Sequence, residues 1–181
     1  MMVYKHLFIW VEGVDDQRFF ERIVKPILNK IYDCVEIIEY AYMKNEKIVN
    51  FLNSIKSMHA DYIFVTDINS SPCVTTKKRD LKNRIANIDE GKIIVVIKEI
   101  ESWYLAGLDD MALKKCGFKK CNNTNDITKE RFNDICQKKF GSHVDCMIEL
   151  LKFFSLEVAR QRNSSFSYFY QRYIRLFSNA G

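Results

Sequence analysis

The chain lacks any hydrophobic run long enough to cross a membrane: the apolar stretch at 93–97 is among its longest, and a spanning helix needs about 20 such residues. It also lacks a glycine-rich phosphate-binding loop, because Gly13 stands alone after the first apolar segment. Two of its three histidines, His6 and His59, fall outside any arrangement typical of a nucleophilic triad. The sequence therefore argues against a membrane-spanning protein, an ATPase, a dinucleotide-binding enzyme and a triad hydrolase.

The composition is that of an ordinary globular protein. Hydrophobic residues make up 48% and charged residues 28% of the 181 residues, which suits one domain with a real core and at most a modest appendage. This mixture excludes a disordered tail, a fibrous protein and a coiled-coil rod. The N-terminus leads directly into an apolar strand and an acidic turn at Glu12, which predicts no cleavable signal and a cytoplasmic location.

Six cysteines without a secretory signal predict reduced thiols rather than a disulfide framework. A structural zinc site is an open alternative with loose ligand spacing, and it would use Cys116, Cys121, His143 and Cys146.

The net charge of +5 lies entirely in the second part of the chain. Residues 1–101 contain 15 basic and 15 acidic side chains, whereas residues 102–181 contain 13 basic and 8 acidic ones. A neutral front and a basic back indicate an anionic partner for the second part.

The first part alternates between strand and helix patterns. Continuous apolar runs predict strands over 7–11, 35–42, 62–66 and 93–97, and apolar positions at helical spacing predict helices between them, over 19–27, 46–58 and 77–88. Asp15 or Asp16 is expected to cap the first helix, and Pro26 to kink or shorten it. This order predicts a parallel α/β sheet of four strands flanked by helices.

The pattern changes near Glu101, beyond which the chain reads as helical. We therefore expect an α/β domain over 1–106 and a basic helical C-terminal extension over 107–181.

Acidic side chains follow three of the four predicted strands. Glu12 ends the first strand with Asp15 and Asp16 just beyond, Asp67 ends the third, and Glu99 and Glu101 follow the fourth. Because the carboxyl ends of parallel strands meet at one edge of a sheet, these carboxylates are expected to converge there. Their mutual repulsion would be relieved by a divalent cation, and oxygen ligands favour Mg²⁺ or Mn²⁺. Any single acid could instead be a solvated cap.

The residues that carry these acids resemble a known family. Val11-Glu12-Gly13-x-x-Asp16, together with Asp67-Ile68-Asn69 after an apolar strand, is similar to the TOPRIM domain, the Mg²⁺-binding fold of topoisomerases, primases and several nucleases. The segment 99–106, Glu-Ile-Glu-Ser-Trp-Tyr-Leu-Ala, and the later Asn163-Ser164-Ser165-Phe166 resemble small TOPRIM-like proteins allied to the OLD-family nucleases of defence systems. The chain departs from the family at Asn69, where the family has a second aspartate.

The resemblance implies a metal-dependent nuclease and a role for each matching residue. Glu12 would act nearest the scissile phosphate, as a metal ligand or general acid/base, and Asp16 and Asp67 would bind one cation with Asn69 as an auxiliary ligand. Glu101 and Glu99 would complete a second cation site, and Lys98 would neutralise charge on the transition state. An ATPase of a defence system is the kind of protein partner that the resemblance implies.

Two basic stretches are candidates for contact with nucleic acid, although each also has the pattern of a solvated or core helix. The first follows Asp67, and the second is formed by the last 22 residues, in which arginines are interleaved with aromatic residues. Their candidate residues are Lys77, Lys78, Arg79, Lys82, Arg84, Arg160 and Arg162.

Two other functions remain open. Asn69 brings no charge, so the chain could be a catalytically impaired TOPRIM-like binding subunit of a larger complex. A phospho-accepting receiver domain would use Asp15, Asp16, Asp67 and Lys98, but a receiver needs five strand–helix units and the sequence predicts four strands.

Overall fold

The computed structural model describes residues 4–175 of the chain. The chain divides into two compact units, residues 1–95 and residues 96–181. The domain boundary after residue 106 stays a prediction.

The first unit is built around a four-stranded parallel sheet with the strand order β2-β1-β3-β4. The strands are β1 (His6–Val11), β2 (Cys34–Glu39), β3 (Asp61–Asp67) and β4 (Ile93–Val96). In the central strand, Phe8 lies opposite Glu36 of β2 and Tyr62 of β3. The predicted α/β fold with a four-stranded sheet is confirmed.

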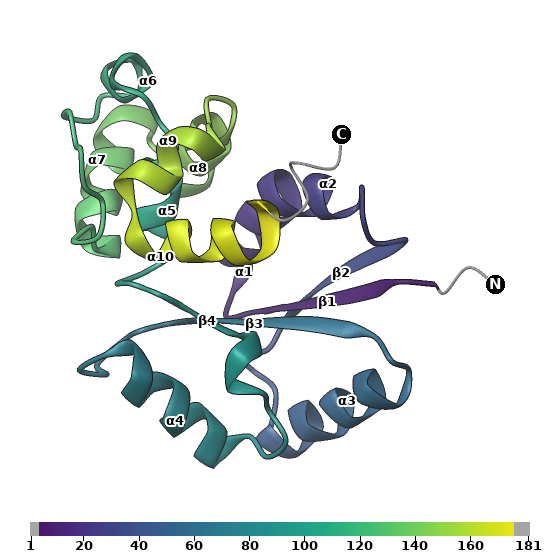
Figure 1. Ribbon diagram of the computed structural model, residues 1–181. Helices are drawn as coiled ribbons and strands as arrows, with labels where there is room; N and C mark the ends of the chain where they lie inside the picture. Colours follow the sequence, from purple (N-terminus) through teal and green to yellow (C-terminus); the bar gives the residue numbers. More distant parts are fainter. Residues whose placement is uncertain (1–3, 176–181) are drawn as a thin grey trace. The chain divides into compact units, whose positions relative to one another are not determined.

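Helices cover both faces of the sheet (Figure 1). One face carries α1 (Val14–Phe19), a π-helical turn η1 (Phe20–Val24) and α2 (Lys25–Leu28), and the other carries α3 (Asn45–Ser57) and α4 (Val74–Arg84). A short 3₁₀ turn, η2 (Glu90–Lys92), precedes β4. Because strand side chains alternate between faces, Phe8 and Trp10 both point to the α3 and α4 face and pack with Leu52 and Leu81.

The first helix differs from its prediction at both ends. Gly13 is the N-cap residue, and no side chain caps this helix; Asp15 and Asp16 lie inside the first turn, where Asp15 pairs with Arg18 at 2.6 Å. The capping prediction is therefore wrong. The two carboxylates in the first turn still interact favourably with the positive end of the helix dipole. Pro26 lies at the start of α2, directly after the π-helical turn. The wider turn fits a proline that has no N–H to donate.

Three other predicted boundaries shift for local reasons. β2 ends at Glu39 because a turn closes from Met43 N to Tyr40 O at 2.8 Å. α4 begins at Val74 and ends at Arg84, since Ile85 is extended. β4 ends at Val96, because the backbone N–H of Ile97 donates to Ser165 Oγ and not to the carbonyl of a neighbouring strand.

The second unit is helical in its described part, as predicted, apart from the last residue of β4. Its helices are α5 (Glu101–Ala106), α6 (Asp110–Lys115), α7 (Lys129–Phe140), α8 (His143–Leu151), α9 (Leu156–Arg162), α10 (Ser164–Phe169) and a π-helical turn η3 (Tyr170–Ile174). Phe166 and Phe169 are buried against Trp103, which favours the core interpretation of the aromatic stripe. Phe177 of that stripe lies outside the described residues. In the described part of the chain, no helix combines the length and apolar character that a membrane span requires.

A buried hydrogen-bond network joins the two late motifs of the sequence. Ser165 Oγ accepts from the indole Nε1 of Trp103 at 2.9 Å and from the backbone N of Ile97 at 3.2 Å, and it donates to Asn163 Oδ1 at 2.8 Å. Asn163 Nδ2 in turn donates to Ser102 Oγ at 3.3 Å and to Thr124 Oγ1 at 3.1 Å. These hydrogen bonds therefore join segments 97–103 and 163–165. They give the polar residues of both segments a structural role that requires no catalytic or ligand-binding function.

The prediction of reduced cysteines is wrong for two of the six. Cys136 of α7 and Cys146 of α8 form a disulfide, because the packing of these helices brings their Cα atoms to 5.5 Å. Cys34, Cys73, Cys116 and Cys121 are free thiols. With its sulfur in the disulfide, Cys146 is not available as a zinc thiolate, so the sequence-based zinc set loses one of its ligands.

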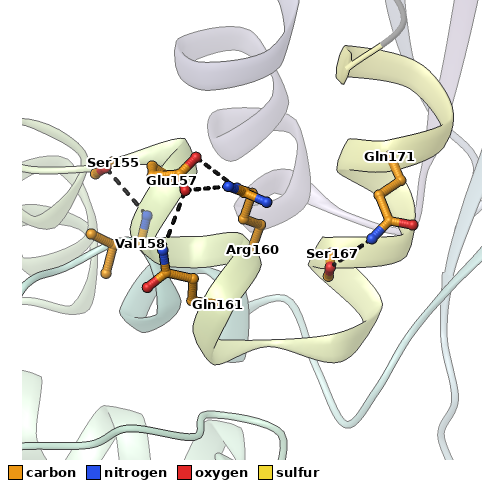
Figure 2. Close-up of polar contacts among 7 residues, drawn as sticks. All are labelled: Ser155, Glu157, Val158, Arg160, Gln161, Ser167 and Gln171. Atoms are coloured by element: carbon orange, nitrogen blue, oxygen red, sulfur yellow. Dashed lines mark hydrogen bonds and ion pairs between the residues drawn. The ribbon is translucent and has the colours of Figure 1, made fainter.

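The network predicts a specific loss of stability. Ser165→Ala removes the acceptor of a buried donor, the Trp103 indole, and of a half-buried one, the Ile97 N–H. We therefore expect the free energy of unfolding to fall by about 1–3 kcal/mol for the buried donor and by less for the other. Urea denaturation measures this change. Ser167→Ala is the matched control, because Ser167 only accepts a 3.4 Å bond from exposed Gln171 (Figure 2), and its loss should stay within about 0.5 kcal/mol. Equal losses in the two variants would contradict the assigned role of Ser165.

Candidate metal centre

The carboxylate of Glu12 is held by donors from the neighbouring strands. Glu12 directly follows β1, and its Oε1 accepts from Thr66 Oγ1 at 2.6 Å and from the backbone N of Asp67 at 3.1 Å, both at the end of β3. The Tyr40 hydroxyl, just after β2, lies 3.3 Å from the same oxygen and 2.9 Å from Val65 O, so its one hydrogen can serve either. These contacts fix the carboxylate in one orientation at the carboxyl edge of the sheet.

The second oxygen of Glu12 is left for another partner. The three contacts above all involve Oε1, and no donor among residues 4–175 reaches Oε2. Because Oε1 already receives strong hydrogen bonds, Oε2 can accept a cation without the side chain having to turn. The hydrogen bonds therefore hold the carboxylate so that Oε2 faces away from the donors of β3.

Tyr40 remains a neutral phenol beside this carboxylate. Burial raises the pKa of Tyr40 well above its usual value, and the negative charges of Glu12 and Asp16 add to the shift, with the Thr66 hydrogen bond opposing it. The hydroxyl therefore keeps its proton through the neutral range. Asp16 is itself 6% exposed in the first turn of α1.

Lys77 is the site residue whose role the sequence did not reveal. Its side chain is buried in α4, and burial lowers its pKa while the charges of Glu12 and Asp67 act to raise it. Lys77 is therefore buried within the field of these carboxylates and does not belong to a solvated basic face. The signal was its spacing: Lys77, Leu81 and Ile85 recur every four residues, and all three are buried.

Asn69 lies in the turn after β3, where it is exposed and has a φ of 50°. Asparagine tolerates this left-handed conformation better than most residues do. The backbone therefore gives a reason for an asparagine here that is independent of any metal. Its role as an auxiliary ligand stays a prediction.

The donor set of the first unit fits an oxygen-preferring cation. Glu12 and Asp67 end adjacent strands, and Mg²⁺ is commonly bound by one or two carboxylates together with waters and substrate phosphates. Glu12, Asp16 and Asp67 do not bring three ligand atoms within 4.8 Å of one another, so they do not form a closed cage. A Mg²⁺ or Mn²⁺ site with Glu12, Asp16 and Asp67 as ligands stays a prediction.

The acids of the second unit contact the start of α7. Glu99 Oε2 accepts from the backbone N of Lys129 at 2.6 Å, and Glu101, only 1% exposed, lies 3.4 Å from Lys129 Nζ. Glu99 thus stabilises the N-terminus of α7, whereas Glu101 forms an ion pair with the side chain of the first residue of that helix. Lys98 is exposed and has a φ of 65°. A second cation site with Glu99 and Glu101, and a catalytic role for Lys98, stay predictions.

The predicted nucleic-acid contacts separate into exposed and internally paired residues. On α4, Arg79 and Arg84 are exposed. Lys82 is also exposed, but its Nζ lies 3.8 Å from Glu90 Oε1, and Lys78 Nζ donates to Glu90 O at 3.2 Å. Arg160 pairs with Glu157 one turn earlier on α9 (Figure 2).

Arg162 has a structural task in the second unit. Its guanidinium donates to Leu108 O at 2.6 Å and to Asp110 at 2.7 Å, and its side chain is 14% exposed. An arginine held in this way ties α9 to the start of α6. Its contact with nucleic acid stays a prediction.

The second unit also contains a hollow that the sequence did not indicate. Its volume is about 360 Å³, and Leu105, Phe118 and Ile127 form an apolar floor. Its rim is mostly cationic, with one acid, and comprises Lys119, Lys120, Arg131, Lys138 and Asp134.

The fold and the first-unit site define a parallel α/β protein in which hydrogen bonds hold the Glu12 carboxylate at a strand end. No family model matches the chain, and no curated protein matches it either. Among solved structures, the C-terminal region of the Burkholderia pseudomallei OLD protein is similar, with 12% sequence identity and a TM-score of 0.47. The match covers 87% of this chain and 92% of that one. A likeness of this size transfers neither residue roles nor activity to this chain.

Tyr40 predicts a pH dependence of stability. The pKa of Tyr40 in the folded chain is raised above its unfolded value near 10. The protonated hydroxyl therefore contributes fully to the free energy of unfolding below about pH 10, and this contribution is lost as the pH rises further. We expect Tyr40→Phe to weaken the fall in unfolding free energy between about pH 9 and pH 11. Urea denaturation across that range is the measurement, with Tyr42→Phe as the control because Tyr42 is fully exposed. A Tyr40→Phe variant with the parent's pH dependence would refute the assignment.

Proposed function

We propose that this chain hydrolyses phosphodiester bonds of nucleic acid with Mg²⁺ or Mn²⁺, as a TOPRIM-type nuclease of the OLD-like kind. The observation that carries the proposal is Glu12: β3 holds one of its oxygens while the other stays open, beside Asp67 and Lys77. The sequence motifs around Glu12 and Asp67 support the same function.

Each residue would have a defined task in this reaction. Glu12 Oε2 and the Asp67 carboxylate would hold the cation, whose chemistry is to activate water and to stabilise charge on the phosphate. Thr66 and the Asp67 amide would keep Glu12 from turning away. Lys77 would offset the negative charge that the carboxylates present to an approaching phosphate.

The central experiment measures cleavage of single- and double-stranded DNA and RNA with Mg²⁺ or Mn²⁺, with and without chelator. We expect Glu12→Gln and Asp67→Asn each to lower the rate by about a hundredfold or more, the scale of loss when one group that stabilises a transition state is removed. Both variants should stay folded, since each removes one of several clustered like charges. Asp61→Asn is the matched control at the opposite end of β3, and it should cleave at the parent rate.

Two outcomes would contradict the proposal. Parent-rate cleavage by Glu12→Gln or Asp67→Asn would refute the assigned roles. A wild-type chain that cuts no substrate, yet binds Mn²⁺ in a Glu12-dependent manner, would favour the impaired binding subunit. The uncharged Asn69, in place of the aspartate of the family, is the observation that keeps this second function in view.

The exposed cations of α4 predict a salt-dependent contribution to binding. Replacing Arg79, Lys82 and Arg84 by alanine should weaken binding to nucleic acid and reduce the slope of affinity against salt by up to about 0.7–0.9 for each lost phosphate contact. Fluorescence anisotropy at several salt concentrations measures both quantities. The matched control removes three exposed lysines around α3, namely Lys44, Lys47 and Lys56. An equal loss in the control would show that only net charge matters and would refute the assignment to α4.

A further inference from the structure

We propose that His6, Cys34 and Glu36 form a Zn²⁺ site at the amino end of the sheet, separate from the Glu12 centre. The three side chains come from the starts of β1 and β2. Each offers one ligand atom, and the three atoms all lie within 4.8 Å of one another.

The strand register places these residues together. His6 lies opposite Cys34, and Phe8 lies opposite Glu36, in the parallel pair β1 and β2. Since side chains two residues apart share a face, Cys34 and Glu36 point to the same face of the sheet as His6. The backbone of two paired strands therefore fixes all three ligands, and no loop has to close around the ion.

The distances suit a tetrahedral ion. Glu36 Oε1 lies 2.9 Å from His6 Nε2 and 3.9 Å from Cys34 Sγ. Ligands held at about 2.0–2.3 Å from a tetrahedral zinc are separated from one another by about 3.3–3.8 Å. Small side-chain rotations would convert the observed spacing into coordination.

The surroundings orient the histidine and leave the site accessible. The His6 ring stacks on Phe8 at a centroid distance of 4.1 Å and meets Tyr4 edge-on at 6.1 Å. The side chains of His6 and Glu36 are 21% and 52% exposed, so an ion can enter from solvent. A fixed imidazole lowers the entropy lost when the ligand set closes.

The ligand chemistry selects zinc over magnesium. An imidazole, a thiolate and a carboxylate are the nitrogen, sulfur and oxygen ligands of zinc sites, whereas Mg²⁺ prefers oxygen alone. Binding would release the Cys34 thiol proton, and the two anionic ligands would then balance the charge of the ion. Three protein ligands leave the fourth position to water.

This site is independent of the proposed nuclease centre. His6 and Glu12 are six residue steps apart along β1, which corresponds to about 20 Å along a strand. Zinc binding and cleavage can therefore fail separately in an experiment.

The test is titration of the whole, chelator-treated chain with Co²⁺ and with Zn²⁺ in excess Mg²⁺, which occupies sites built from oxygen alone. We expect one Co²⁺ per chain, with a thiolate-to-cobalt charge-transfer band and the visible absorption of a tetrahedral site. Zn²⁺ should displace Co²⁺ and remove both signals. Zn²⁺ should also raise the melting temperature, because it binds the folded chain.

Variants assign the site to its ligands. Cys34→Ser should abolish the charge-transfer band, and Cys34→Ser, His6→Gln and Glu36→Gln should each weaken Zn²⁺ binding by more than about tenfold, since even loss of an outer hydrogen bond at such sites costs roughly 10–100-fold. Cys73→Ser is the control, because Cys73 is a free and exposed thiol outside the cluster.

Three results would overturn the proposal. The first is a wild-type chain without the charge-transfer band, which would leave His6 and Glu36 as an ordinary ion pair. The second is loss of the band in Cys73→Ser instead of Cys34→Ser. The third is unchanged Zn²⁺ affinity in His6→Gln or Glu36→Gln variants that circular dichroism shows to be folded.

Discussion

The site of the first unit depends on one interaction, the hydrogen bonds from the end of β3 to the carboxylate of Glu12. A carboxylate at a strand end would ordinarily turn freely in solvent. Here the Thr66 hydroxyl and the Asp67 amide both donate to Oε1, so the adjacent strand determines where Oε2 lies. This geometry requires β1 and β3 to be parallel neighbours, because only then do their carboxyl ends coincide. Tyr40 contacts this fixed carboxylate, and its charge acts on the buried Lys77.

The second unit uses its most distinctive residues for folding. The motif segments around Trp103 and Asn163 contact each other through buried hydrogen bonds. Each of these bonds gives a partner to a polar group that would destabilise the fold if it were buried unpaired. Glu99 and Glu101, which read as metal ligands, contact the first turn of α7. Polar residues in a recurrent motif can therefore be explained by structure even where the resemblance suggests chemistry.

The two ends of the sheet offer different chemistry. The carboxyl end carries the carboxylates of Glu12 and Asp67 with the buried Lys77, whereas the amino end carries an imidazole, a thiol and a carboxylate on one face. Both arrangements arise from the same strand pair geometry, since parallel register aligns residues that are far apart in the chain. What differs is residue type, and residue type determines whether hard or borderline cations are preferred.

The sequence by itself determined the strand–helix order, the buried strands and the acids that follow them, because apolar periodicity and strand-end carboxylates are local signals. Glu12 and Asp67 were identifiable in this way. Tertiary structure decided which polar groups meet: Thr66 and Tyr40 on Glu12, Lys77 turned inward, Cys136 paired with Cys146, and Cys34 opposite His6. Such contacts join residues 10 to 54 positions apart, and their distances follow from strand register and helix packing, which no local pattern encodes.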